Sequence, residues 1–170
     1  MFHHKSSAGV RLLLALVLGA AMAGESRLAG AEPDTPNATY LVDRTDDSAA
    51  ATACTSAPND CSLRGAILKA NTTGSADTIT IPEGTYKLTR AGAGEDAGLT
   101  GDLDILDDVA VSGAGSGKTI LDGAQKDRVF HIRGSASNPL TVEISGVTIR
   151  NGKPPQNESG GAVSNLHGYL

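Results

Sequence analysis

The chain has 170 residues, enough for one modest domain, and a net charge of −5. Aromatic residues make up 3% of it, with no tryptophan, whereas glycine occurs 21 times. The negative charge disfavours nucleic acid and anionic lipid as partners. The composition favours short strands and tight turns over a bundle of helices.

The first 31 residues have the pattern of an export signal. Lys5 and Arg11 precede the apolar run LLLALVLGAAMA, and small residues follow it, ending with AGA at 29–31. The run is shorter than the roughly 20 residues that cross a bilayer. We interpret residues 1–31 as a cleaved signal peptide, with an uncleaved N-terminal anchor as the alternative. Because of this leader we expect an exported protein. No other segment is apolar enough to span a membrane.

The segment after the leader contains one expected strand, two cysteines and the only expected helix. The strand is expected at 39–43. Cys54 and Cys61 would meet an oxidising environment after export, where a disulfide can close the short loop between them. Apolar residues spaced i, i+3, i+4 and i+7 predict a helix at 63–70, and Ser62 is a typical N-cap residue.

From residue 77 onward, short alternating segments are separated by Gly, Asp and Asn. We expect strands at 77–81, 85–89, 102–106, 109–113, 119–123, 129–133, 140–145 and 147–152. No helical pattern lies between them, so the second half of the chain is predicted to be all-β.

Two pairs of segments in this half of the chain repeat a similar sequence. VAVSG at 109–113 matches VEISG at 142–146, and TILDG at 119–123 matches TIRNG at 148–152. Repetition at this spacing indicates a solenoid of short parallel strands, with Asp122 and Asn151 at equivalent corners. The alternative is an antiparallel sandwich with the same texture of strands and turns.

The stretch SGAGSGKTILDG, residues 112–123, superficially resembles a phosphate-binding loop. Such a loop needs a glycine five residues before Gly117, but Ser112 occupies that position. The β-prone residues that follow end at Asp122 and Gly123, so no helix N-terminus would face a phosphate. We therefore expect no nucleotide site, and interpret the glycines as a corner between two strands.

The block CSLRGAILKAN at 61–71 resembles the CSLREA domain, found at the start of exported bacterial right-handed parallel β-helix proteins. The likeness continues through DTITIPEGTYKLT, TGDLDI, VSGAGSGKTILDG, RVFHI and VEISGVTIRNG, and GGAVSN at 160–165 is similar to the start of another coil. The resemblance implies a capping segment at 32–76, followed by β-helix coils at 77–170. The short helix would cover the first coil.

The chain departs from this family in two ways. Gly65 stands where the family has a glutamate that completes a capping box with the N-cap serine, so Gly65→Glu is expected to raise the melting temperature. The chain also ends at Leu170, where the family usually continues, and we expect an incomplete C-terminus from a truncated product.

Carboxylates are the only candidates for chemistry. Asp102 and Asp104 lie two apart on an expected strand, so they share a face and could bind calcium; the alternative is a solvated acidic loop. His131 has no identifiable partner and is interpreted as an exposed strand residue. No catalytic constellation is present, so no enzyme activity is expected from these residues.

The predicted function is a non-catalytic β-helix module of a bacterial surface or adhesin-like protein. It would present its strand faces to carbohydrate or to a cell-surface protein, outside the cell, on its surface or at the outer membrane. The alternative is the N-terminal part of a polysaccharide lyase or glycosidase built on the same fold.

Overall fold

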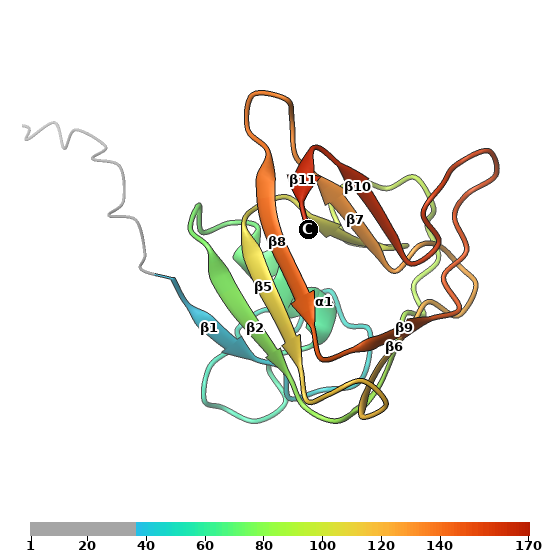
Figure 1. Ribbon diagram of the computed structural model, residues 1–170. Helices are drawn as coiled ribbons and strands as arrows, with labels where there is room; N and C mark the ends of the chain where they lie inside the picture. The colour runs from blue at the N-terminus through green and yellow to red at the C-terminus, as the bar shows by residue number, and fades with distance from the viewer. Residues whose placement is uncertain (1–36) are drawn as a thin grey trace, which may run out of the picture. The chain divides into compact units, whose positions relative to one another are not determined.

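The computed structural model describes residues 37–170 (Figure 1). Its elements are β1 (Thr39–Leu41), α1 (Leu63–Ala70), β2 (Asp77–Ile81), β3 (Gly84–Lys87), β4 (Leu103–Ile105), β5 (Val109–Gly113), β6 (Thr119–Asp122), β7 (Phe130–Arg133), β8 (Leu140–Ser145), β9 (Thr148–Arg150), β10 (Val163–Leu166) and β11 (Gly168–Tyr169). Within this part of the chain, no helix combines the length and apolar character needed to cross a bilayer. The expected signal peptide, residues 1–31, lies outside the described residues.

The expected elements are present, with ends displaced by two residues at most. The helix spans Leu63–Ala70 as predicted, and the strand expected at 39–43 is the shorter β1. The GGAVSN segment leads into β10. The prediction of a mainly β structure is therefore confirmed for residues 37–170.

The strands form three sheets in which all neighbours are parallel. One sheet has the order β1-β2-β5-β8-β11, and the other two have the orders β10-β7-β4 and β3-β6-β9. From β2 to β11 the chain visits the three sheets in the same order, again and again (Figure 1). An antiparallel sandwich, the alternative left open by the sequence, is therefore wrong.

The register confirms one of the two sequence copies and corrects the other. Val109 pairs with Val142, which is the alignment that the first copy predicts. In the second copy Ile120, not Thr119, pairs with Thr148. Asp122 consequently lies beside Arg150, one residue before Asn151, and its carboxylate accepts hydrogen bonds from both side chains. The corner after β6 is thus one residue out of step with the sequence match.

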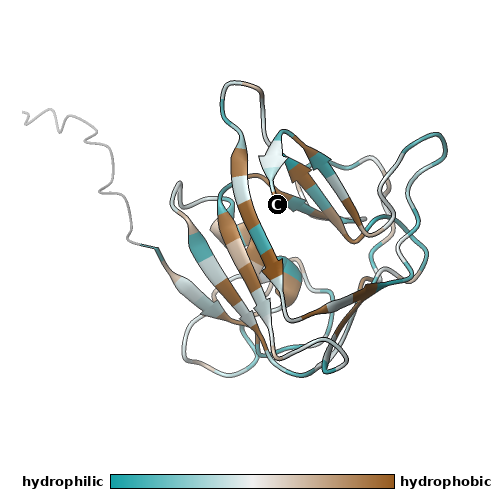
Figure 2. Cartoon of the chain, viewed as in Figure 1, coloured by the Kyte–Doolittle hydropathy of each residue, from teal (hydrophilic) through white to brown (hydrophobic). Residues whose placement is uncertain are grey.

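In the five-stranded sheet, every second residue of β2, β5 and β8 faces the core. Ile79 of β2, Val111 of β5 and Val142 of β8 are buried, whereas their neighbours along each strand are partly or fully exposed. Brown bands alternate with paler ones along these strands in Figure 2. Parallel pairing places Ile79 beside Val111, and Val109 beside Val142, so the apolar side chains form a continuous core.

Helix α1 packs its apolar face on this core. Leu63, Ala66, Ile67 and Ala70 belong to the same buried cluster as the strands, and α1 contacts β2 and β4 (Figure 1). The Ser62 hydroxyl accepts a hydrogen bond from the Gly65 amide at 2.9 Å, which confirms the predicted N-cap. The helix therefore takes its stability mainly from tertiary packing, as a helix this short requires.

Gly65 is needed for a close approach, contrary to the sequence interpretation. A Cβ atom at this position would overlap the backbone carbonyl of Ala51, whose oxygen accepts from the Ser62 amide at 3.2 Å. The absence of the capping glutamate thus has a steric cause, because any side chain at Gly65 would displace the segment around Ala51. The expected stabilisation by Gly65→Glu is wrong.

The glycine-rich stretch forms the corner between β5 and β6. Gly117 has φ +86°, a left-handed conformation that L side chains rarely adopt. The amides of Lys118 and Thr119 both donate to the carbonyl of Gly115, which tightens the turn. Because the turn leads straight into a strand, the interpretation as a corner is confirmed.

Cys54 and Cys61 form a disulfide, as expected. The loop that it closes is also held by Asp43, whose carboxylate accepts from the Cys61 amide at 2.9 Å. Burial alone would raise the pKa of Asp43, but hydrogen bonds from several backbone amides, including that of Cys61, lower it. The disulfide therefore fixes the chain directly before the N-cap of α1.

Candidate functional site

The acidic residues between 95 and 108 separate into surface groups and a buried group. Glu95 folds its own loop, because its carboxylate accepts from the amides of Ala97, Leu99 and Thr100. By contrast, the side chains of Asp102 and Asp104 are buried. The expectation of a solvated acidic loop is therefore wrong for these two residues.

Asp102 and Asp104 flank Leu103 of β4 and both approach the same histidine. His131 of β7 lies opposite Asp104 in the parallel register, and its Nδ1 is 3.2 Å from Asp104 Oδ1 and 4.0 Å from Asp102 Oδ2. The two carboxylates thus lie on the same side, as their spacing predicts. His131 is only 6% exposed, so the interpretation as an exposed strand residue is wrong.

Arg128 supplies the positive charge nearest to these groups. Its Nε donates to Asp102 Oδ2 at 2.7 Å, its Nη1 donates to the partly exposed Glu158, and its Nη2 lies 3.4 Å from His131 Nδ1. Asp127 is buried beside it. We call Asp102, Asp104, Asp127, Arg128 and His131 the acidic cluster.

Three carboxylate oxygens of the acidic cluster have no hydrogen-bond partner among the described residues. They are Asp102 Oδ1, Asp104 Oδ1 and Asp127 Oδ2, all buried. Leaving a buried polar atom unpaired costs about 1–3 kcal/mol, and more for a charged group. Such atoms are rare in folded proteins and indicate a strained or reactive group, or one that binds water or an ion.

Burial and mutual repulsion shift the pKa values of the acidic cluster. Burial, followed by the charge of Asp102, raises the pKa of Asp104 to about 7. Burial also raises the pKa of Asp102, although Arg128 opposes the shift. The pKa of His131 is lowered by burial and by Arg128. The imidazole is therefore neutral at pH 7, whereas Asp104 exchanges its proton near that pH.

A second buried ionic group holds the loop that covers this side of β4. Arg64, 1% exposed, donates from Nε to Asp47 at 2.6 Å and from its other nitrogens to the carbonyls of Gly98, Gly101 and Asp102. We call Arg64, Asp47 and these three backbone carbonyls the Arg64 cluster. Gly98 in turn donates its amide to Asp104 Oδ2 at 2.8 Å, which joins the two clusters.

Sequence reasoning missed Arg64, Arg128 and Asp127. Arg64 lies in the first turn of a helix whose neighbouring residues are apolar, which hinted at burial, but its partners are 17 to 38 residues away. Arg128 and Asp127 lie in an ordinary polar turn before β7. Only the parallel stacking of β7 on β4 brings them to Asp102.

Asp96 extends the acidic cluster to the surface. One ligand atom each from Asp96, Asp104 and His131 lie within 4.8 Å of one another. The Asp96 side chain is 55% exposed, and its Oδ2 is 3.1 Å from Arg133 Nη2. Asp102, which the sequence proposed as a calcium ligand with Asp104, is not part of this group; calcium binding by that pair remains a prediction.

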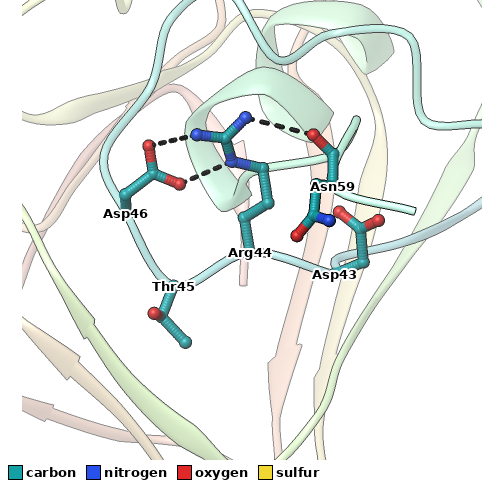
Figure 3. A pocket seen from close by; sticks show the side chains of 5 residues that line it. All are labelled: Asp43, Arg44, Thr45, Asp46 and Asn59. Carbon is teal, nitrogen blue, oxygen red and sulfur yellow. Dashed lines mark hydrogen bonds and ion pairs between the residues drawn. The ribbon is translucent and has the colours of Figure 1, made fainter.

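A hollow of about 430 Å³ lies beside the disulfide loop, and Figure 3 shows the five side chains that line it. Arg44 donates from Nε and Nη2 to the two carboxylate oxygens of Asp46, and from Nη1 to the carbonyl of Asn59 at 3.0 Å. The guanidinium is thus engaged in holding the loop together. This hollow is a weaker candidate than the acidic cluster, because its charged groups already have partners.

Comparison of the chain with models of protein families, with characterised proteins and with solved structures finds no match. The site is therefore interpreted from its own geometry.

Proposed function

We propose that this chain is a non-catalytic, exported module with a right-handed parallel β-helix fold, in which α1 caps the first coil. The observation that carries the proposal is the repeated passage of the chain through three parallel sheets in one order. Crossovers between parallel strands are right-handed in nearly all proteins, which supports the handedness. The resemblance of residues 61–71 to a CSLREA domain supports the cap and the export.

The proposed binding surface is the outer face of the five-stranded sheet. The register places Leu41, Thr80 and Ser112 in one row across β1, β2 and β5, and Ser145 of β8 continues the row. Three of these four outward side chains are small and carry a hydroxyl, whereas Leu41, at the edge of the sheet, is a large apolar residue. A repeated row of hydroxyl groups offers hydrogen bonds at a regular spacing, which suits an extended, polar chain.

A depression beside this row adds acidic groups. It measures about 280 Å³, and its lining includes Asp108, Thr141 and Glu143. Carboxylates accept hydrogen bonds from sugar hydroxyls, and the hydroxyls of Ser and Thr both donate and accept them. We therefore favour a carbohydrate ligand over a protein. The absence of tryptophan in the chain indicates binding by hydrogen bonds more than by stacking.

One observation favours the enzyme alternative, namely the raised pKa of Asp104 near a second carboxylate and a histidine. However, Asp102 and Asp104 are each 0% exposed, and a sugar chain needs both carboxyl groups of a glycosidase at the surface. The covered position of this pair favours the non-catalytic proposal.

Binding of the full chain to an array of polysaccharides tests this function. Thr80→Gln, in the centre of the hydroxyl row, is expected to weaken binding by roughly tenfold because it removes a hydroxyl and obstructs the face. Thr85→Gln is the matched control, since Thr85 is also an exposed threonine, on β3 in another sheet. Equal binding by both variants, or binding to no polysaccharide, contradicts the proposal.

A further inference from the structure

Asp104 is the group of the acidic cluster that most clearly lacks a charged partner. Asp102 has Arg128 at 2.7 Å, and Asp96 has Arg133 at 3.1 Å. The Asp104 side chain is 0% exposed; among residues 37–170, its Oδ2 accepts only from a backbone amide and its Oδ1 has no hydrogen-bond partner. A buried carboxylate in this condition needs either a proton or a cation.

The unpaired oxygen faces a nitrogen at the spacing of two ligands on one ion. Asp104 Oδ1 and His131 Nδ1 are 3.2 Å apart. Ligands that bind a zinc-sized ion at about 2.0–2.2 Å are about 3–3.5 Å apart when adjacent. All three donor atoms, including that of Asp96, lie within 4.8 Å of one another, so only a small movement of the exposed Asp96 is needed for closure.

From this geometry we propose that Asp96, Asp104 and His131 bind one divalent transition-metal cation of the zinc type. A set of one imidazole nitrogen and two carboxylate oxygens suits zinc and its neighbours, whereas calcium takes six to eight oxygen ligands. The site therefore differs from the expected calcium pair in both its residues and its metal. It goes beyond the proposed carbohydrate surface and does not depend on it.

The surroundings of the three ligands are compatible with an ion. The lowered pKa of His131 keeps the imidazole neutral, the form that binds metals. Arg128 Nη2, 3.4 Å from His131 Nδ1, has to turn aside, and it keeps its contacts with Asp102 and Glu158 through its other nitrogens. The ion would enter from the side of Asp96, the only one of the three ligands that is mostly exposed.

The test is isothermal titration of the full chain with zinc chloride and, separately, with calcium chloride. The leader histidines are replaced in every sample by His3→Gln and His4→Gln, so that they cannot bind the ion. We expect one saturable zinc site and weaker or no calcium binding. Absence of saturable zinc binding, or a preference for calcium, overturns the proposal.

Matched variants assign the site to its residues. Asp96→Asn and His131→Gln are each expected to weaken zinc binding by roughly tenfold or more. Asp46→Asn and His167→Gln are the controls: Asp46 is a similarly exposed aspartate paired with an arginine, and His167 is an exposed histidine. Unchanged affinity in Asp96→Asn overturns the proposal even if His131→Gln fails to fold, because Asp96 is a surface residue.

Discussion

The Arg64 cluster and the acidic cluster are both buried and charged, but they differ in how completely their polar atoms are paired. Arg64 donates to one carboxylate and three carbonyls, and the second oxygen of Asp47 accepts from the amides of Thr89 and Arg90. In the acidic cluster, three carboxylate oxygens have no hydrogen-bond partner within the described part of the chain. A complete network is typical of a structural role, and an incomplete one of a site that accepts something more.

The largest expected effect comes from breaking the complete network. Arg64→Ala leaves Asp47 and three carbonyls buried without their donor, so the free energy of unfolding is expected to fall by about 3–5 kcal/mol. Urea denaturation measures it. Arg44→Ala is the control, because Arg44 also binds an aspartate and a carbonyl but its side chain is 33% exposed, and the substitution should cost less than about 1 kcal/mol. Equal costs would show that burial of Arg64 contributes nothing.

The next effect concerns the helix that carries Arg64. Gly65→Glu is expected to lower the free energy of unfolding by about 3 kcal/mol, because the new side chain overlaps the Ala51 carbonyl. Gly65→Ala should cost nearly as much, since the clash begins at Cβ. Thermal unfolding of both variants measures this. A melting temperature of Gly65→Glu above that of the wild type would restore the capping-box interpretation.

The acidic cluster should show its incomplete pairing as a pH dependence. Below about pH 4 Asp104 is protonated in both the folded and the unfolded chain. Between about pH 4 and pH 7 the unfolded chain loses this proton, whereas the folded protein keeps it. The free energy of unfolding therefore falls as the pH rises through this range. Asp104→Asn removes this fall, so in EDTA the free energy of unfolding of the variant, relative to that of the wild type, should rise by about 3 kcal/mol from pH 4 to pH 7. A difference that does not change with pH would contradict the raised pKa.

The smallest effect is expected at the rim of the acidic cluster. Glu158 is 47% exposed and binds Arg128, which also has Asp102 as a buried partner. Glu158→Gln should change the free energy of unfolding by less than about 1 kcal/mol in urea denaturation. A loss comparable to that of Arg64→Ala would mean that the acidic cluster depends on this exposed glutamate outside it.

Local patterns were sufficient for the elements but not for the site. Alternation of apolar residues predicted the strands, and Ser62 with its spaced apolar residues predicted α1 within its observed bounds. The corner after β6 was misaligned by one residue because the short match TILDG to TIRNG outweighed the actual strand register. Sequence similarity over five residues cannot fix a register that packing decides.

The site depends on partners that are distant in sequence. Arg128 reaches Asp102 across 26 residues, and Arg64 reaches Asp102 across 38. His131 was interpreted as exposed because its own strand supplies no partner, whereas the neighbouring strand does. Gly65 was interpreted as a defect of the helix because the carbonyl that requires it belongs to a separate loop.

The reach of Arg64 has a consequence for how the chain acquires its structure during synthesis. The guanidinium belongs to the helix, yet three of its acceptors lie between residues 98 and 102. While the ribosome has delivered only the helix and β2, the guanidinium has Asp47 as a partner but lacks these three carbonyls. The hydrogen bonds around Arg64 can therefore be completed only after residue 102 has been made, so the packing of the earliest segment waits for a later one.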